Sequence, residues 1–433
     1  MTLLSGSLIF YGLGEPKYVL LLMASVVVNY FFGLSLGRGV KQRGSETYRK
    51  KLNRKRKTVL AAALILNVGL LAAFKYGAGG LRMPLGISFY TFQIVSYLLD
   101  VYRGDQKREI SFMTMATYIT MFPQLLSGPI TYYGEVREAL YEREFHARGV
   151  EEGLKVFTMG FAAKVLLADR IGLLWQDVQV RGFESISTQL AWLGAIAYSM
   201  KIYFDFYGYS LMAVGLGRML GFRLPENFRN PYMACTVREF YRRWHMTLGR
   251  WFARYVYIPL GGNRKGEFRT SCNLLAVWFL TSIWHGNTPN FMIWGMLLWL
   301  AIVAERQLDA LGILKHFMKG PGRVISQLYL WTFIPITWIC FEITDMEQLQ
   351  IYLGRMFHVM QGINVAAGDW KNALTDYGSL LAAGAFACTP ALQKLFRRFK
   401  DNVLVTLLLA VLFWICVWRL EVEGQNPFKY LDF

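Results

Sequence analysis

Residues 282–294 read SIWHGNTPNFMIW and join two apolar runs through a short polar break. Gly286 directly follows His285, and Pro289 comes soon after, which is a pattern that ends a helix. A break between two apolar helices puts irregular backbone near membrane depth. Such backbone is tolerated only where protein buries it or where it lines a water-filled cavity. The stretch therefore predicts membrane helices that surround His285.

His285 is the first candidate catalytic residue. An ionisable side chain at membrane depth is a functional candidate by default. The carbonyl end of a helix carries partial negative charge, which stabilises an imidazolium and makes the imidazole a better base. We predict that His285 takes a proton from a nucleophilic hydroxyl, a contribution worth roughly 10²–10⁴ in rate. The alternative is a structural histidine.

Apolar runs recur from one end of the chain to the other. The 433 residues are 54% hydrophobic, and Pro/Ser-rich linkers are missing between the runs. A membrane span needs roughly 20 mostly apolar residues. We predict an all-α polytopic membrane protein with a single domain over residues 1–433 and about eleven transmembrane or re-entrant helices. The predicted helices are 18–36, 59–76, 85–101, 112–130, 154–174, 190–207, 274–284, 291–304, 328–341, 377–391 and 403–418.

The net charge of +18 is concentrated between the apolar runs. The loop Arg38–Lys57 holds ten Lys/Arg and one acid, Glu46. Basic loops of this kind mark the cytoplasmic side of a membrane and attract anionic lipid. We therefore predict a multi-pass protein of the cell membrane with Arg38–Lys57 in the cytoplasm, and we predict no nucleic-acid partner.

A second stretch, residues 240–262, reads FYRRWHMTLGRWFARYVYIPLGG. Treated as one helix, it places Arg243, Arg250 and Arg254 on one stripe. His245 then lies on another side and faces an apolar environment. Basic residues beside aromatics suit an interfacial anchor, and they also suit a rim that faces the phosphates of a nucleotide-like acyl donor. Both interpretations of the arginines remain open at this point.

The sequence lacks the motifs of metal sites, serine hydrolases and nucleotide-binding loops. The five Cys and five His show neither CxxC nor HExxH spacing, so we predict no metal site and no tightly bound cofactor. A GxSxG elbow and a phosphate-binding P-loop are also missing from the sequence. The glycine-rich run at 215–221 (GLGRMLG) is better explained by close helix packing.

Eight motifs are distributed along the chain: PLGISFYTFQIVSYLLDVYRGD (84–105), MFPQLLSGPI (121–130), YFDFYGYSLMAVGLGRMLGF (203–222), PENFRNPY (225–232), RRWHMTLGRW (242–251), YIPLGGNRKG (257–266), IWHGNTPNFMIWG (283–295) and NPFKYLDF (426–433). Together these motifs resemble the membrane-bound O-acyltransferase family, and within it the bacterial alginate and peptidoglycan O-acetyltransferase branch.

The resemblance implies a ring of membrane helices around a central funnel or tunnel, with His285 as the family's key histidine and His245 as a second characteristic one. It implies transfer of an acyl group, commonly acetyl from a cytoplasmic thioester such as acetyl-CoA, toward hydroxyls of an extracytoplasmic polysaccharide or cell-wall polymer. A glycan-acetylating partner protein outside the membrane is expected.

Three other functions were weighed against acetyl transfer. D-alanyl transfer to teichoic acids is the chemistry of the nearest related branch. A transporter or flippase of a lipid-linked saccharide would carry charged pairs in several spans and an internal repeat. The predicted spans carry few charged residues, among them Lys164 and Asp205. A non-catalytic scaffold would make His285 dispensable.

Overall fold

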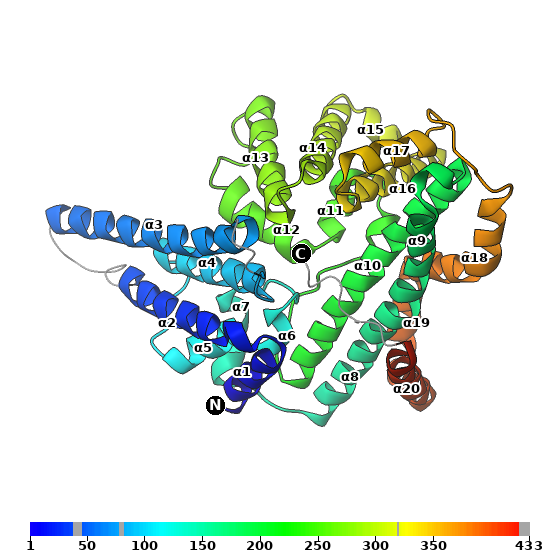
Figure 1. Cartoon of the computed structure of the whole chain (residues 1–433). Helices are drawn as coiled ribbons and strands as arrows, with labels where there is room; N and C mark the ends of the chain where they lie inside the picture. Colours follow the sequence, from blue (N-terminus) through cyan, green and yellow to red (C-terminus); the bar gives the residue numbers. More distant parts are fainter. Residues whose placement is uncertain (38–45, 78–81, 318–319, 424–433) are drawn as a thin grey trace. The chain divides into compact units, whose positions relative to one another are not determined.

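The structure is a computed structural model that describes residues 1–37, 46–77, 82–317 and 320–423. Within these ranges every regular element is helical, from α1 near the amino terminus to α20 (Figure 1). The predicted all-α class is confirmed. The terminal motif at 426–433 lies outside the described residues.

Among the described residues, five helices are long and apolar enough to cross a membrane. They lie at Pro16–Leu36, Lys50–Tyr76, Pro289–Ala310, Pro321–Glu342 and Val403–Val422. The remaining predicted spans are helical, but they are shorter, more polar or broken. A membrane protein with several spanning helices is therefore confirmed, whereas the count of about eleven is not.

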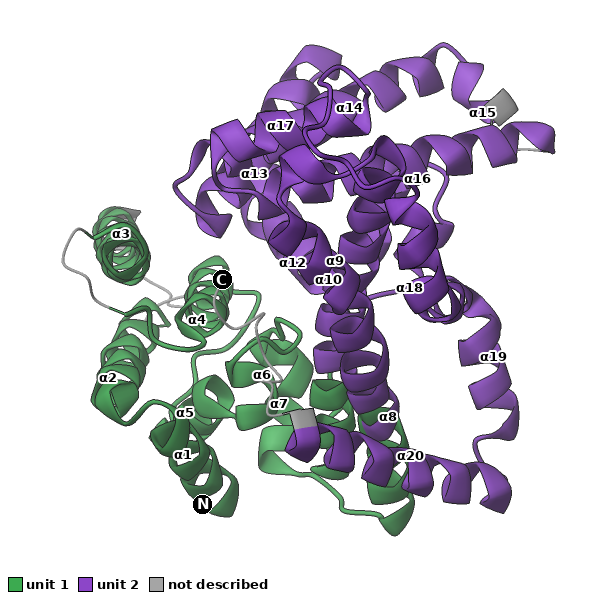
Figure 2. Ribbon diagram, turned by 45° about the vertical axis from the view of Figure 1, so that its right-hand side comes forward, with its two compact units in different colours: residues 1–157, 212–225, 432 green, residues 158–211, 226–431, 433 purple. Residues whose placement is uncertain are grey.

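The chain divides into two compact units, coloured separately in Figure 2. Unit 1 consists of Met1–Phe157 and Met212–Pro225, and unit 2 consists of Thr158–Leu211 and the described part of Glu226–Leu431. Two of the boundaries fall inside α8 (Ala147–Ala162) and α10 (Thr188–Met219), and the third follows Pro225, beyond the end of α10. The single domain over residues 1–433 stays a prediction.

Unit 1 is built on helices that follow one another closely in sequence. Buried polar pairing joins two of them: Asn29 and Asn67 exchange two amide hydrogen bonds of 3.0 and 2.7 Å between α2 and α3. The helices are α1 (Thr2–Gly14), α2 (Val19–Leu36), α3 (Glu46–Tyr76), α4 (Ile87–Arg103), α5 (Phe112–Thr120), α6 (Phe122–Leu125) and α7 (Tyr133–Tyr141).

Two predicted segments of unit 1 need correction. The predicted span 112–130 is broken at Met121, between α5 and α6. Pro123, near the start of α6, has no N–H to donate back into α5, which favours a break there.

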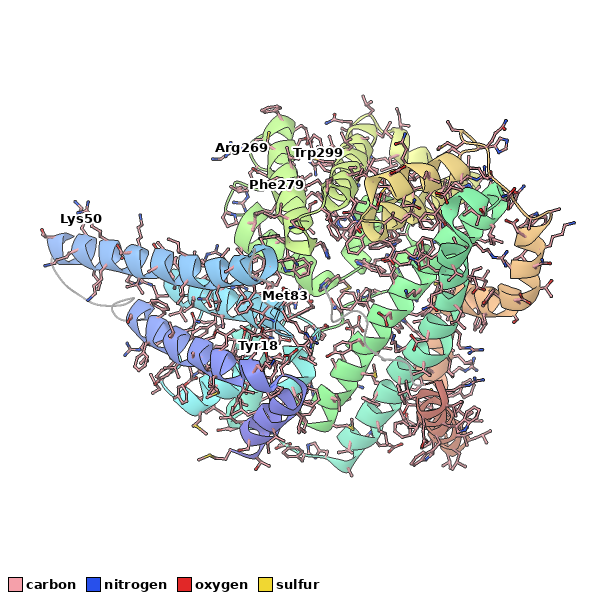
Figure 3. The ribbon with its side chains drawn as sticks, viewed as in Figure 1. Tyr18, Lys50, Met83, Arg269, Phe279 and Trp299 are labelled. Carbon is pink, nitrogen blue, oxygen red and sulfur yellow. The ribbon has the colours of Figure 1, made fainter. Side chains whose placement is uncertain are left out.

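The basic segment Arg38–Lys57 is also not a plain loop. Residues 38–45 lie outside the described residues, but α3 begins at Glu46 and includes the remaining basic residues. Lys50 lies near the start of this helix (Figure 3). Arg56 is buried, and its guanidinium donates to the carbonyls of Leu36 (2.8 Å) and Tyr102 (2.5 Å). The cytoplasmic side of this segment stays a prediction.

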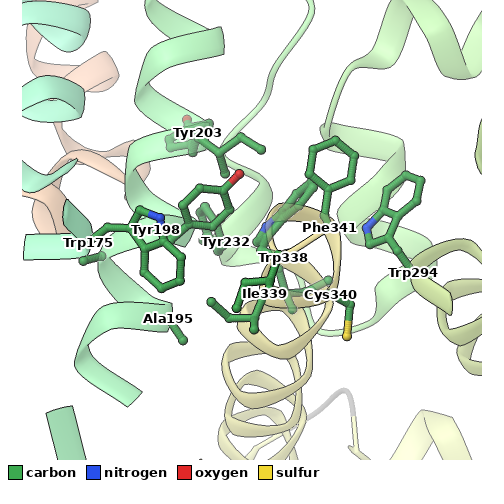
Figure 4. Packing of buried hydrophobic residues seen from close by; sticks show 14 of the residues in the cluster. Trp175, Ala195, Tyr198, Tyr203, Tyr232, Trp294, Trp338, Ile339, Cys340 and Phe341 are labelled. Carbon is green, nitrogen blue, oxygen red and sulfur yellow. The ribbon is translucent and has the colours of Figure 1, made fainter. Parts of the chain in front are cut away.

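Unit 2 holds the larger aromatic core. Trp175, Tyr203, Trp338 and their neighbours are buried against one another (Figure 4). The helices that carry this core and its surroundings are α9 (Asp169–Arg181), α11 (Val237–Arg243), α12 (Met246–Phe252), α13 (Glu267–His285), α14 (Pro289–Ala310), α15 (Ile313–Phe317), α16 (Pro321–Glu342), α17 (Met346–Met356), α18 (Asp369–Ala387), α19 (Pro390–Phe399) and α20 (Val403–Glu423).

The charges singled out in the predicted spans form one buried cluster in unit 2. Lys164 lies in a π-helical turn, Ala163–Ala168, between α8 and α9. Its ammonium is 2.6 Å from Asp205 Oδ1 and 2.7 Å from Asp169 Oδ1. A buried charge must be paired to be tolerated. Gly208 lets the helices approach this closely, because a Cβ there would lie 2.6 Å from the Gly160 carbonyl oxygen.

Candidate active site

The predicted break after His285 is confirmed. α13 ends at His285, Gly286 continues in extended backbone, and α14 begins at Pro289. His285 is thus the last residue of a 19-residue helix. Its imidazole lies at the carbonyl end of that helix.

Aromatic rings surround the His285 imidazole. The ring centroids of Trp284, Trp294 and Phe341 lie 4.5, 5.2 and 4.9 Å from the imidazole centroid. Phe291 stacks further away, at 6.3 Å. These rings come from α13, α14 and α16, so packing among three helices fixes the position of the imidazole.

Two close contacts hold these helices together. A Cβ on Gly295 of α14 would lie 1.9 Å from Ser282 Oγ of α13, so glycine permits the approach. Asn290 is fully buried at the start of α14, and its amide donates to the carbonyls of Cys340 (3.1 Å) and Phe341 (2.9 Å) in α16. Trp299, further along α14, donates to the Ser271 carbonyl of α13 at 3.0 Å (Figure 3).

The stretch 240–262 is not one helix, and this corrects the prediction. α11 ends at Arg243, α12 begins at Met246, and His245 between them has left-handed φ and ψ of 43° and 53°. Two backbone bonds explain the break: Arg229 N–H donates to the Arg243 carbonyl, and Met246 N–H donates to the Asn227 carbonyl, both at 2.9 Å. A neighbouring extended segment thus replaces the helical bonds at this point.

Glu305 of α14 fixes the start of α11. Its buried carboxylate accepts the backbone N–H groups of Val237 (2.5 Å) and Arg238 (2.9 Å). A carboxylate at a helix N-terminus satisfies N–H groups that lack helical partners. The helix that follows His285 therefore also positions the helix that precedes His245.

The two histidines line one cavity in unit 2. Its volume is about 390 Å³, within the usual range of small-molecule sites. The cavity is lined mainly by aromatic and aliphatic side chains from α10 to α16. The polar and titratable residues in the lining are Arg238, Tyr241, Arg242, His245, Tyr257, Thr281, His285 and Arg306.

Arginines line the cavity too, but not the predicted ones. Arg243 pairs with Glu239, Arg250 is exposed, and the Arg254 guanidinium lies 5.6 Å from the Tyr255 ring. These three residues are outside the lining of the cavity. The predicted stripe assumed a continuous helix, and the break at His245 changes which side chains face the cavity.

The arginines of the lining are Arg238, Arg242 and Arg306. Arg238 pairs with Asp309 at 3.0 Å, and Arg306 pairs with Glu267 at 3.1 Å. Arg306 follows directly on the predicted span 291–304, so a charge at the end of an apolar run was the available signal. Arg238 and Arg242 lie in a segment with many basic residues, so the sequence did not distinguish them from the other arginines.

His245 is 5% exposed and lies outside the five spanning helices. Burial lowers the pKa of its imidazole from 6.5 to about 3, so the ring is neutral at physiological pH. The Phe206 ring packs edge-on against it at 4.7 Å. A neutral imidazole keeps one unprotonated nitrogen, whose lone pair can accept a hydrogen bond from a hydroxyl. The absence of a metal site stays a prediction.

Comparison with known proteins agrees with these features. Residues 105–342 match the sequence model of the membrane-bound O-acyltransferase family. The probable alginate O-acetylase AlgI of Pseudomonas putida is 29% identical, over 100% of this chain and 94% of its own length. The peptidoglycan O-acetyltransferase of Helicobacter pylori is 31% identical, over 80% and 71%. The teichoic acid D-alanyltransferase of Bacillus subtilis is 28% identical, over 49% and 56%.

Proposed function

The chain belongs to the membrane-bound O-acyltransferase family and is an O-acyltransferase, and from this premise we propose that it moves an acetyl group from a cytoplasmic thioester, such as acetyl-CoA, toward hydroxyls of an extracytoplasmic polysaccharide or cell-wall polymer. The observation that supports this most is the cavity with both histidines in its lining. The proposal includes a ring of membrane helices around a funnel or tunnel.

The proposed reaction uses the histidines as proton carriers. The acceptor hydroxyl oxygen forms a bond to the acyl carbon while the C–S bond of the thioester breaks. A histidine nitrogen in the cavity takes the hydroxyl proton and passes it to the departing thiolate, so the products are an ester and a thiol. The acceptor hydroxyl in this step belongs to the polymer or to the partner protein that passes the acetyl group on to the polymer. General-base help of this kind is worth roughly 10²–10⁴ in rate.

The donor is proposed to enter on the arginine side of the cavity. Arg238, Arg242 and Arg306 present guanidinium groups, which bind phosphate through paired hydrogen bonds. The apolar remainder of the lining suits a small acyl group and excludes competing water. We further propose that an extracytoplasmic partner protein completes placement of the acetyl group on the polymer.

Acetyl content of the surface polymer tests the proposal. We would measure base-released acetate in wild-type cells, in a deletion strain and in His285→Ala at matched membrane levels. His146 is exposed, and its Nε2 lies 2.9 Å from Glu144 Oε2, so His146→Ala is the matched histidine control. Loss of acetate in the deletion and in His285→Ala, with retention in the control, supports the proposal.

An unchanged acetate content in the deletion strain would overturn acetyl transfer. D-alanyl esters of teichoic acids would then be measured in the same strains. That second chemistry is favoured less because the D-alanyltransferase relative matches only half of this chain, whereas the two O-acetyltransferase relatives match 80% or more.

A further inference from the structure

Three hydrogen-bond donors converge on one amide oxygen beside His245. Asn227 Oδ1 is 3.0 Å from His245 Nδ1, 3.2 Å from the Thr247 backbone nitrogen and 2.9 Å from Thr247 Oγ1. All three residues are buried, with exposures of 2%, 5% and 0% for Asn227, His245 and Thr247. The Asn227 side chain therefore belongs to the immediate surroundings of the imidazole.

The backbone donor fixes the orientation of the amide. Thr247 N–H can only donate, so the Asn227 atom that faces it must be the oxygen and not the NH₂ group. That oxygen can only accept, so His245 Nδ1 must carry the hydrogen in their shared bond. A neutral imidazole has one N–H, which leaves Nε2 as an acceptor with a lone pair.

His245 Nε2 makes no hydrogen bond to any residue that the structure describes. The residue lines the cavity that also contains His285. A buried polar atom ordinarily has a partner, and a substrate group in the cavity can supply one. A hydroxyl is a suitable group, because its proton can bond to the Nε2 lone pair.

We propose that Asn227 is a positioning residue that holds His245 in the Nδ1–H tautomer, so that Nε2 accepts the proton of the acceptor hydroxyl during acyl transfer. This role rests on the proposed function. It adds to that function a residue that orients His245 through hydrogen bonds. His285 lies among aromatic rings in the same cavity.

A purely structural role for Asn227 makes different predictions. The Asn227 main chain already joins the helix break through the bond from Met246 N–H to its carbonyl, at 2.9 Å. That bond survives any change of the side chain. Removal of the side-chain oxygen should therefore affect the tautomer and the orientation of the imidazole more than the course of the backbone.

The first test compares Asn227→Ala, Asn227→Asp and Asn230→Ala in native membranes, with labelled acetyl-CoA and the cells' own surface polymer. Asn230 is a buried asparagine of the same segment that donates to the Cys388 carbonyl and does not contact His245. We expect Asn227→Ala to lower kcat roughly 10–100-fold, with a smaller change in KM. Asn230→Ala should keep the wild-type kcat per folded protein.

Asn227→Asp sharpens the test through pH. The aspartate keeps an oxygen acceptor, and its negative charge favours imidazolium and raises the pKa of His245. The other titratable groups in the cavity lining are unchanged; they are Arg238, Tyr241, Arg242, Tyr257, His285 and Arg306. We expect partial rescue of kcat at high pH and an acid limb displaced to higher pH. Wild-type kcat in Asn227→Ala, or an unmoved acid limb in Asn227→Asp, would overturn the proposal.

The tautomer of His245 can be determined without an activity measurement. Nitrogen NMR of ¹⁵N-histidine-labelled protein in bilayers distinguishes protonated from unprotonated ring nitrogens, and loss of a signal in His245→Asn identifies the residue. We expect protonated Nδ1 and unprotonated Nε2. The reverse tautomer overturns the assignment even in an active enzyme. If the tautomer is as expected but no acyl transfer occurs, the proposed function fails while the positioning of His245 by Asn227 stands.

Discussion

His285 is the last residue of a regular 19-residue helix, whereas His245 lies between two seven-residue helices in a left-handed conformation. Rings from three helices surround the first histidine, whereas the second bonds to the Asn227 amide oxygen and packs against the Phe206 ring. Left-handed backbone at a residue other than glycine costs of order 1–3 kcal/mol and persists where the surroundings enforce it.

The comparison indicates two kinds of positioning in one cavity. Aromatic packing restricts where a ring lies but leaves the choice of protonated nitrogen to other groups. A hydrogen bond of fixed polarity determines that choice. A proton-transfer site needs both, because a base must be near the reacting group and must present its lone pair. Each prediction below changes one of the two histidine regions and leaves the other intact.

The largest effect is expected from the histidines themselves. We predict that His245→Ala and His285→Ala each lower kcat by roughly 10²–10⁴. Because both residues line one cavity, the double variant should lose no more than the more damaged single variant, as is usual for groups that act as a unit. Acetyl transfer from labelled acetyl-CoA in membranes measures this. Multiplicative losses would show that the two histidines act in independent steps.

The two regions also differ in how far the sequence predicts them. Gly286 and Pro289 follow an apolar run, and these local signals correctly predicted that the helix ends at His285. The break at His245 depends on bonds between residues far apart in sequence: Asn227 and Met246 are 19 residues apart, and Arg229 and Arg243 are 14 residues apart. A helical wheel contains no information about such bonds, so the arginine stripe drawn from it did not match the cavity.

The fold shows the same division. Apolar runs predicted where helices occur, because such a run can be recognised from local composition alone. The break at Met121, between α5 and α6, lies close to a single proline within an apolar run. The sequence prediction treated that run as one continuous helix. The motif PENFRNPY contained Asn227, but its hydrogen bonds to His245 and Thr247 required coordinates.

The second effect concerns packing around His285. A Cβ on Gly286 would lie 2.2 Å from Phe291 Cε2, and this ring stacks on the His285 imidazole. We predict that Gly286→Ala lowers the free energy of unfolding by roughly 1–3 kcal/mol through overpacking. Acetyl transfer should also fall, because the ring that contacts His285 must move. Thermal unfolding in lipid nanodiscs, followed by the transfer assay, measures both.

Gly378 of α18 provides the control for that change. A Cβ there meets nothing within 4 Å, and the residue lies inside a helix. Gly378→Ala should therefore stabilise the protein by roughly 0.4–1 kcal/mol and leave transfer unchanged. If Gly286→Ala and Gly378→Ala changed the free energy of unfolding and acetyl transfer equally, the argument that packing at Gly286 positions His285 would be contradicted.

The third effect is a pH dependence that belongs to the His245 region. In the unfolded chain an imidazole binds a proton below about pH 6.5, whereas burial lowers the pKa of folded His245 to about 3. The unfolded state therefore binds more protons between these values. The free energy of unfolding should fall as the pH drops below about 6.5, by up to about 1.4 kcal/mol per pH unit.

His245→Asn isolates this contribution. Asparagine tolerates left-handed backbone, its NH₂ group can donate to Asn227 Oδ1, and it does not titrate. We predict that the wild-type Tm falls more than the Tm of His245→Asn between about pH 7.5 and pH 5. Equal losses of Tm would mean that the folded state already accepts a proton at His245 in this range.

The smallest effect distinguishes the arginines of the cavity from those of the predicted stripe. Arg242 lines the cavity and is exposed, so its interaction with a donor phosphate should contribute only about 0.2–1 kcal/mol. We predict that Arg242→Ala raises KM for acetyl-CoA roughly 1.5–5-fold without a change in kcat, and that added salt reduces the difference. Arg254→Ala should leave KM unchanged, because Arg254 lies outside the lining. A rise in KM for Arg254→Ala, with Arg242→Ala silent, would instead favour the arginine stripe of a continuous helix and place the donor away from the two histidines.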